Sequence, residues 1–126
     1  MNSEVSSGTA EAGRRREVVV NGKRVKVVDL HAHCAIPEAM ALMGLTAHLP
    51  ALLLADPRER IAAMDAQGID VEALSINPYW YGADYDVARD LIALQNEKLA
   101  EACASTADRF VGLASVALQH PELAAE

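Results

Sequence analysis

The stretch Val25-Lys26-Val27-Val28-Asp29-Leu30-His31-Ala32-His33 decides the fold and contains the candidate site. It begins as a run of β-branched residues, and its alternation of polar and apolar side chains is lost as it proceeds. This pattern is typical of a strand that enters a core covered on both faces. We therefore expect this stretch to be a strand of a buried parallel sheet.

A β-hairpin is predicted just before this strand. The β-rich runs Glu17 to Val20 and Lys23 to Leu30 are separated by Asn21-Gly22, a dipeptide that tolerates positive φ and suits a two-residue turn. The hairpin should feed into the longer strand that carries the histidines.

The segment that follows has clear helix signals. Asp56-Pro57-Arg58-Glu59 offers a carboxylate cap, a proline at the first helical position and a glutamate three residues after the cap. Gly68 should end this helix, and Val71 to Ile76 should form the next strand, ended by Asn77-Pro78.

The remaining chain repeats this alternation. Residues Asp86 to about Ser105 carry the longest helical pattern, Phe110 to Leu118 is a strand candidate, and Pro121 to Glu126 resembles the first turns of another helix. Strands that alternate with helices imply βαβ units, so the predicted fold class is α/β with about three β/α units. Three such strands leave one sheet face bare, and the sequence ends within a helical pattern. We therefore expect a chain that is truncated relative to its parent domain.

Composition and charge exclude several function classes. The 126 residues carry a formal net charge of −7, and the only basic cluster is Arg14 to Arg16, which argues against nucleic-acid binding. Two cysteines are too few for a disulfide framework. The sequence shows neither a secretory signal nor a clean run of about 20 apolar residues. We expect a cytoplasmic protein that binds no membrane.

Asp29, His31 and His33 form the candidate site. Strand alternation would place all three on one face, with the two imidazoles roughly 6.5 Å apart along the strand. Imidazole nitrogens bind zinc and similar divalent metals, and a catalytic site takes about three protein ligands. We therefore predict that His31 and His33 are two metal ligands and that Asp29 supports them. The alternative is that they are ordinary polar residues at a strand end.

Other polar and aromatic residues are weaker candidates for the functional site. His48 and His120 lack partners at ligand spacing and are predicted to lie in loops or on the surface. Cys34 should point away from the histidines if the strand continues. Pro78, Tyr79 and Trp80, followed by Tyr81, come just after the second parallel strand, where they would either line a substrate pocket or cover the rim of the fold.

Several blocks of this sequence resemble one known family. Val27 to His33 resembles the first barrel strand of the amidohydrolase-related family that includes 2-amino-3-carboxymuconate 6-semialdehyde decarboxylase. The other matching blocks are Asp56-Pro57 with Arg60-Ile61, Met64 to Asp70, Arg109 to Ala114, and Leu118-Gln119. The resemblance covers roughly residues 25 to 126, and several blocks in the same order are more specific than any one motif.

The resemblance implies a (β/α)₈ TIM-type barrel of which this chain is the N-terminal portion. The Ser-, Glu-, Ala- and Gly-rich N-terminus predicts a disordered leader at 1–15. The resemblance assigns residues 16–126 to a partial amidohydrolase-type barrel, truncated at its C-terminus. It also implies a divalent metal, zinc first and manganese second, held by His31 and His33. The other ligands, a histidine and an aspartate, and a histidine for acid/base chemistry would lie beyond Glu126.

The function implied by the resemblance is that of a metal-dependent carboxy-lyase, a decarboxylase acting on a small carboxylated substrate. Two alternatives stay open: a metal-dependent hydrolase of the same superfamily, and an inactive truncated fragment. The full-length protein could form a homodimer. One departure from the muconate decarboxylase is that no arginine occurs between His33 and Asp56 to clamp a substrate carboxylate.

Overall fold

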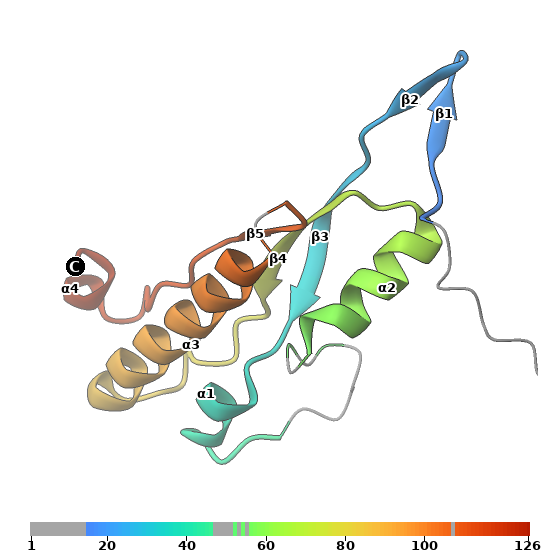
Figure 1. Ribbon diagram of the computed structural model, residues 1–126. Coiled ribbons are helices and arrows are strands. Elements are labelled where there is room, and N and C mark those ends of the chain that lie inside the picture. Colours follow the sequence, from blue (N-terminus) through green and yellow to red (C-terminus); the bar gives the residue numbers. More distant parts are fainter. Residues whose placement is uncertain (1–14, 47–51, 53, 55, 107) are drawn as a thin grey trace, which may run out of the picture.

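The computed structural model describes residues 15–46, 52, 54, 56–106 and 108–126 of the chain. An antiparallel hairpin of β1 (Val18–Val20) and β2 (Lys23–Val25) projects away from the rest of the molecule (Figure 1). Asn21 and Gly22 have φ angles of 49° and 75°, so the predicted turn is confirmed. The leader predicted at 1–15 lies outside the described residues, except for Arg15.

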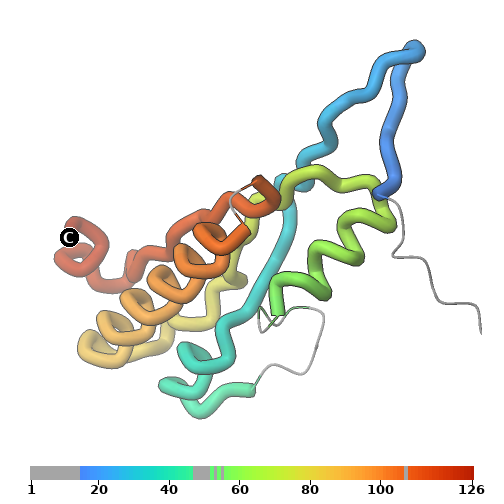
Figure 2. Tube along the Cα trace, viewed as in Figure 1, coloured from blue at the N-terminus to red at the C-terminus, as the bar shows by residue number. Residues whose placement is uncertain are grey.

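The main sheet is parallel and has the strand order β3 (Val28–Cys34), β4 (Val71–Ile76) and β5 (Phe110–Gly112). Helix α2 (Pro57–Gln67) connects the first two of these strands, and α3 (Tyr85–Ser105) connects the last two (Figures 1 and 2). Two short helices complete the described elements, α1 (Pro37–Ala41) and α4 (Pro121–Ala124). The predicted alternation of strands and helices is confirmed.

Helix α2 begins and ends where local chemistry predicts. The side chain of Asp56 accepts a hydrogen bond from the backbone N–H of Arg58 at 2.9 Å, and Pro57 occupies the first turn. Gly68 ends the helix in the left-handed conformation, with φ of 80°. These contacts fix the point at which the chain leaves α2 and enters β4.

The core lies between the sheet and the helices. Its buried members include Ala32 and Cys34 of β3, Leu74 and Ile76 of β4, Phe110 of β5, and Leu91 and Leu99 of α3. The opposite sheet face is open to solvent, and Leu30 and Val111 are 76% and 52% exposed. Because neighbouring strand residues point to opposite faces, residues such as His33 and Ser75 belong to this open face.

A charged cluster around Asp70 joins the amino ends of the strands. Asp70 accepts hydrogen bonds from the backbone N–H of Val27 at 2.7 Å and from the guanidinium groups of Arg24 and Arg15. Arg109 donates to the Asp70 carbonyl at 2.9 Å. The hydrogen bond from Val27, assisted by the two arginines, holds the pKa of the Asp70 carboxyl below its ordinary value.

The hairpin leads into the long strand through a short break, which divides the predicted β-rich run Lys23 to Leu30. Strand β2 ends at Val25 and β3 begins at Val28. Between them the Val27 N–H binds the Asp70 carboxylate, and the Val27 carbonyl accepts from the backbone N–H groups of Asp70 and Val71. The hydrogen-bonded backbone of Val27 therefore separates the hairpin from the parallel sheet.

The last strand is also shorter than the predicted Phe110 to Leu118, because β5 ends at Gly112. Side chains from elsewhere bind the backbone beyond this point. Asn96 forms two hydrogen bonds with the backbone of Ser115, at 2.8 and 2.9 Å, and the indole N–H of Trp80 donates to the Val116 carbonyl at 3.0 Å. These contacts replace the strand ladder.

Helix α1 was not predicted and lies in the segment between His33 and Asp56. Its sequence signals are modest: Pro37 in the first turn, followed by Glu38.

None of the helices in the described part of the chain has the length and apolar character needed to span a bilayer.

Replacing Gly68 with alanine should destabilise the fold more than the same change at Gly44. Both glycines have positive φ, so each alanine should cost about 1–2 kcal/mol in backbone conformation. A Cβ at Gly68 would also lie 3.2 Å from the Arg16 carbonyl oxygen and from a Val18 methyl group, whereas Gly44 has open space. Urea denaturation of both variants checks this prediction, and equal losses of stability would contradict it.

Candidate metal centre

His31 and His33 meet at the carboxyl end of β3. Their ring centroids are 4.6 Å apart, and the two Nε2 atoms are separated by 2.8 Å. His31 is exposed and His33 is half-buried. The structure therefore brings together the two imidazoles that the sequence singled out, with one nitrogen of each ring facing the same point.

Strand β3 contains a register shift beside this pair of histidines. Asp29 pairs with Glu72 and Ala32 pairs with Leu74, so β3 contains one extra residue between these pairs, a β-bulge. The Asp29 carboxylate accepts a hydrogen bond from the backbone N–H of His31 at 2.9 Å within the bulge. Asp29 thus supports the local backbone that presents His31.

The bulge corrects one expectation. Simple alternation would put Asp29, His31 and His33 on one face, but Asp29 pairs with Glu72 and His33 pairs with Ser75. Glu72 and Ser75 are three residues apart in β4 and so point to opposite faces. Asp29 therefore does not share the face of His33, and the placement by alternation was wrong.

His33 is held by residues that sequence reasoning missed. The hydroxyl oxygen of Ser75 lies 3.2 Å from His33 Nδ1. Arg60 on α2 donates to the His33 carbonyl at 3.0 Å and pairs with Glu72 through an Nε–Oε2 contact of 2.5 Å. The only sequence signal for these roles was the position of Ser75 and Glu72 within the predicted second strand.

His120 and Cys34 do not join this centre. His120 is half-buried, and its ring packs edge-on against Tyr85. Its Nε2 donates a hydrogen bond to the Ala83 carbonyl at 3.1 Å. His48 lies outside the described residues. Cys34 is buried on the helix side of β3, and burial raises the pKa of its thiol to about 11, which disfavours the thiolate that a metal would bind.

The aromatic segment after β4 divides between two environments. Pro78 and Trp80 border a cavity of about 220 Å³ at the carboxyl ends of β4 and β5, together with Ser75 and Tyr81. Tyr79 does not line it. Its hydroxyl donates to the side-chain oxygen of Gln95 on α3 at 3.2 Å, and burial raises the pKa of this hydroxyl to about 12.

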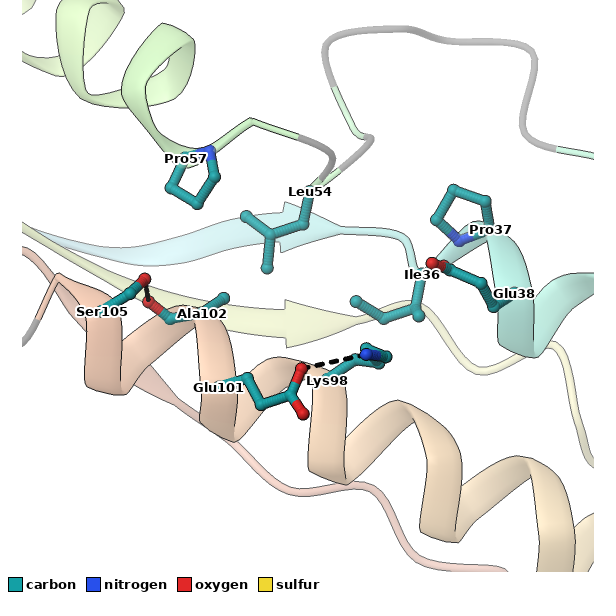
Figure 3. Close-up of a pocket in the computed structure, with 9 residues that line it drawn as sticks. All are labelled: Ile36, Pro37, Glu38, Leu54, Pro57, Lys98, Glu101, Ala102 and Ser105. Atoms are coloured by element: carbon teal, nitrogen blue, oxygen red, sulfur yellow. Dashed lines mark hydrogen bonds and ion pairs between the residues drawn. The ribbon is translucent and has the colours of Figure 1, made fainter.

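A second cavity lies among the helices. It has a volume of about 520 Å³ and is bordered by α1, the start of α2 and the second half of α3 (Figure 3). Its polar lining includes Lys98 and Glu101, which pair with one another at 3.0 Å. Among the residues that the structure describes, its lining includes no histidine, and we assign no chemistry to it.

The two imidazoles fit a divalent cation. Two nitrogens bound to one zinc ion at 2.0–2.1 Å in tetrahedral geometry lie roughly 3.3 Å apart, and small ring rotations would bring the observed 2.8 Å to that value. Within the ranges that the structure describes, no group of three or more His, Cys, Asp or Glu side chains is placed to hold a metal. The described part of the chain therefore offers two candidate ligands for such a site.

Comparison with known proteins adds independent information. No family model matches the chain. A gamma-resorcylate decarboxylase from Rhodococcus jostii is 36% identical over 107 residues, which cover 79% of this chain and 32% of the relative. The predicted resemblance to the amidohydrolase-related family is confirmed. The chain spans about a third of the length of the curated relatives it matches.

Two solved structures agree with this relationship. A dihydroxybenzoic acid decarboxylase from Polaromonas, with bound manganese and the inhibitor 2-nitroresorcinol, has a TM-score of 0.66 and 31% identity. The match covers 79% of this chain and 32% of that one. A Staphylococcus aureus protein classed as an amidohydrolase has a TM-score of 0.68 and 26% identity, over 80% and 32% of the two chains. The predicted fold class, part of a (β/α)₈ barrel with a preceding hairpin, is confirmed.

The Arg60–Glu72 pair beneath His33 should be required for stability. The two side chains are 16% and 9% exposed, so Arg60→Ala leaves a nearly buried carboxylate unpaired and should lower the free energy of unfolding by roughly 3 kcal/mol. Replacing both residues with methionine should cost less, because no charge is then buried.

Urea denaturation measures these effects. Arg89→Ala is the matched control, because Arg89 pairs with Asp86 and Asp90 on the exposed face of α3 and its loss should change stability little. If Arg60→Ala behaved like Arg89→Ala, the structural role of the buried pair would be contradicted.

Proposed function

We propose that this chain supplies His31 and His33 as two metal ligands of a divalent-metal decarboxylase acting on a small carboxylated aromatic compound. The observation that carries the proposal is the 2.8 Å approach of the two Nε2 atoms at the carboxyl end of β3. Parallel barrels keep their chemistry at this end of the strands. Sequence identities of 36% and 35% to two gamma-resorcylate decarboxylases support decarboxylation as the reaction class.

The metal is proposed to be zinc or manganese. Neutral imidazole suits zinc, and the related Polaromonas decarboxylase contains manganese. When bound, such an ion polarises a carboxylate or carbonyl oxygen and lowers the pKa of a bound water. In this proposal the chain orients the two imidazoles toward the metal. The carboxylate of Asp29 contributes by accepting a hydrogen bond from the backbone N–H of His31.

The cavity beside Ser75 is the proposed place for the ring of the substrate. Tyr81, which is 47% exposed, offers aromatic surface there, and Pro78 and the nearly buried Trp80 border the cavity. The indole N–H of Trp80 is already bound to the Val116 carbonyl, so the ring of Trp80 is held in place and contributes only its surface. Tyr79 is left out of this proposal because its hydroxyl binds Gln95.

Metal binding tests the ligand assignment. Titration of the 126-residue chain with Zn²⁺ or Mn²⁺ in a calorimeter should give one site per chain, and either His31→Ala or His33→Ala should abolish it. His120→Ala is the control, because His120 binds the Ala83 carbonyl instead. Undiminished binding in the His31→Ala and His33→Ala variants would sink the assignment.

Product analysis tests the reaction. The natural gene product, loaded with either metal, should release carbon dioxide from gamma-resorcylate or a related hydroxybenzoate and should not cleave ester, lactone or amide bonds. We expect the 126-residue chain alone to be inactive, since it offers two ligands in its described part. Hydrolysis without carbon dioxide release would favour the alternative, a hydrolase of the same superfamily.

A further inference from the structure

We propose that Ser75 is a positioning residue for His33, whose side chain it holds in the tautomer that leaves Nε2 free to bind a metal. The contact is between the Ser75 hydroxyl oxygen and His33 Nδ1, at 3.2 Å. This inference rests on the proposed function, since its purpose is to present a ligand. It assigns a role to a residue that no motif in the sequence marks.

Strand register creates the contact. His33 and Ser75 are direct partners in the β3–β4 pairing, so their side chains leave the sheet on the same face. The neighbours of Ser75, Leu74 and Ile76, point into the core and are nearly completely buried. Ser75 is therefore the β4 side chain that stands beside His33.

The protons around His33 can be assigned consistently. A neutral imidazole carries one proton, and the nitrogen without it is the one that can bind a metal. If Nδ1–H of His33 donates to the Ser75 hydroxyl oxygen, Nε2 keeps a free lone pair directed at Nε2 of His31. In the metal-free chain, that lone pair can accept a hydrogen bond from Nε2–H of His31.

The surroundings make this hydrogen bond more than an incidental surface contact. Both Ser75 and His33 are half-buried, which limits competition from water. Arg60 binds the backbone carbonyl of His33, so the strand cannot shift the ring away from Ser75. Partners of this kind, which bind the second nitrogen of a metal-binding histidine, typically contribute 10–100-fold to metal affinity.

Three variants test the proposal by metal affinity. Ser75→Ala should weaken Zn²⁺ or Mn²⁺ binding by about 10–100-fold. Ser75→Thr keeps the hydroxyl and should restore binding to within a few fold. Ser105→Ala removes a hydroxyl on α3 that binds the Ala102 carbonyl, and it should leave affinity unchanged. Wild-type affinity in Ser75→Ala would overturn the proposal.

The second readout needs no metal. Nitrogen-15 NMR of the metal-free chain near neutral pH should show His33 protonated at Nδ1, and Ser75→Ala should shift it toward protonation at Nε2. A wild-type His33 protonated mainly at Nε2 would overturn the inference. If the tautomer depends on Ser75 but no metal binds through the histidines, the proposed function fails while the positioning role stands.

Discussion

The parallel pairing of β3 with β4, interrupted by one extra residue, is the constraint on which the rest of the structure depends. The shift lies between Asp29 and Ala32, and it decides which side chains of β3 face the helices and which face the open side of the sheet. Ala32 and Cys34 enter the core as a result, while His33 is placed beside Ser75. On the same face, the Nε2 atom of His31 lies 2.8 Å from that of His33.

Much of this architecture was predictable because its signals are local. Asn21-Gly22, Asp56-Pro57 and Gly68 each specify a backbone conformation through their own chemistry, and all three behave as expected. The His-x-His pair could also be found, because it joins a metal-binding residue type to a strand pattern. Its convergence was predicted, although the bulge beside it was not.

Several features that escaped prediction depend on residues distant in sequence. The strand beginning at Phe110 ends early because Asn96 and Trp80 bind the backbone that would have continued it. Ser75 and Arg60 contact His33 across 42 and 27 residues, through strand register and helix packing. Periodicity describes one segment at a time, so it cannot reveal such partnerships.

The two ends of the parallel sheet carry different kinds of polar group. Asp70, Arg24 and Arg109 tie the strands together at their amino ends, while the imidazoles of His31 and His33 lie at a carboxyl end. Changes in the segments that follow β4 and β5 therefore need not disturb the anchoring cluster. Such a separation lets evolution vary what a scaffold recognises while the scaffold itself stays intact.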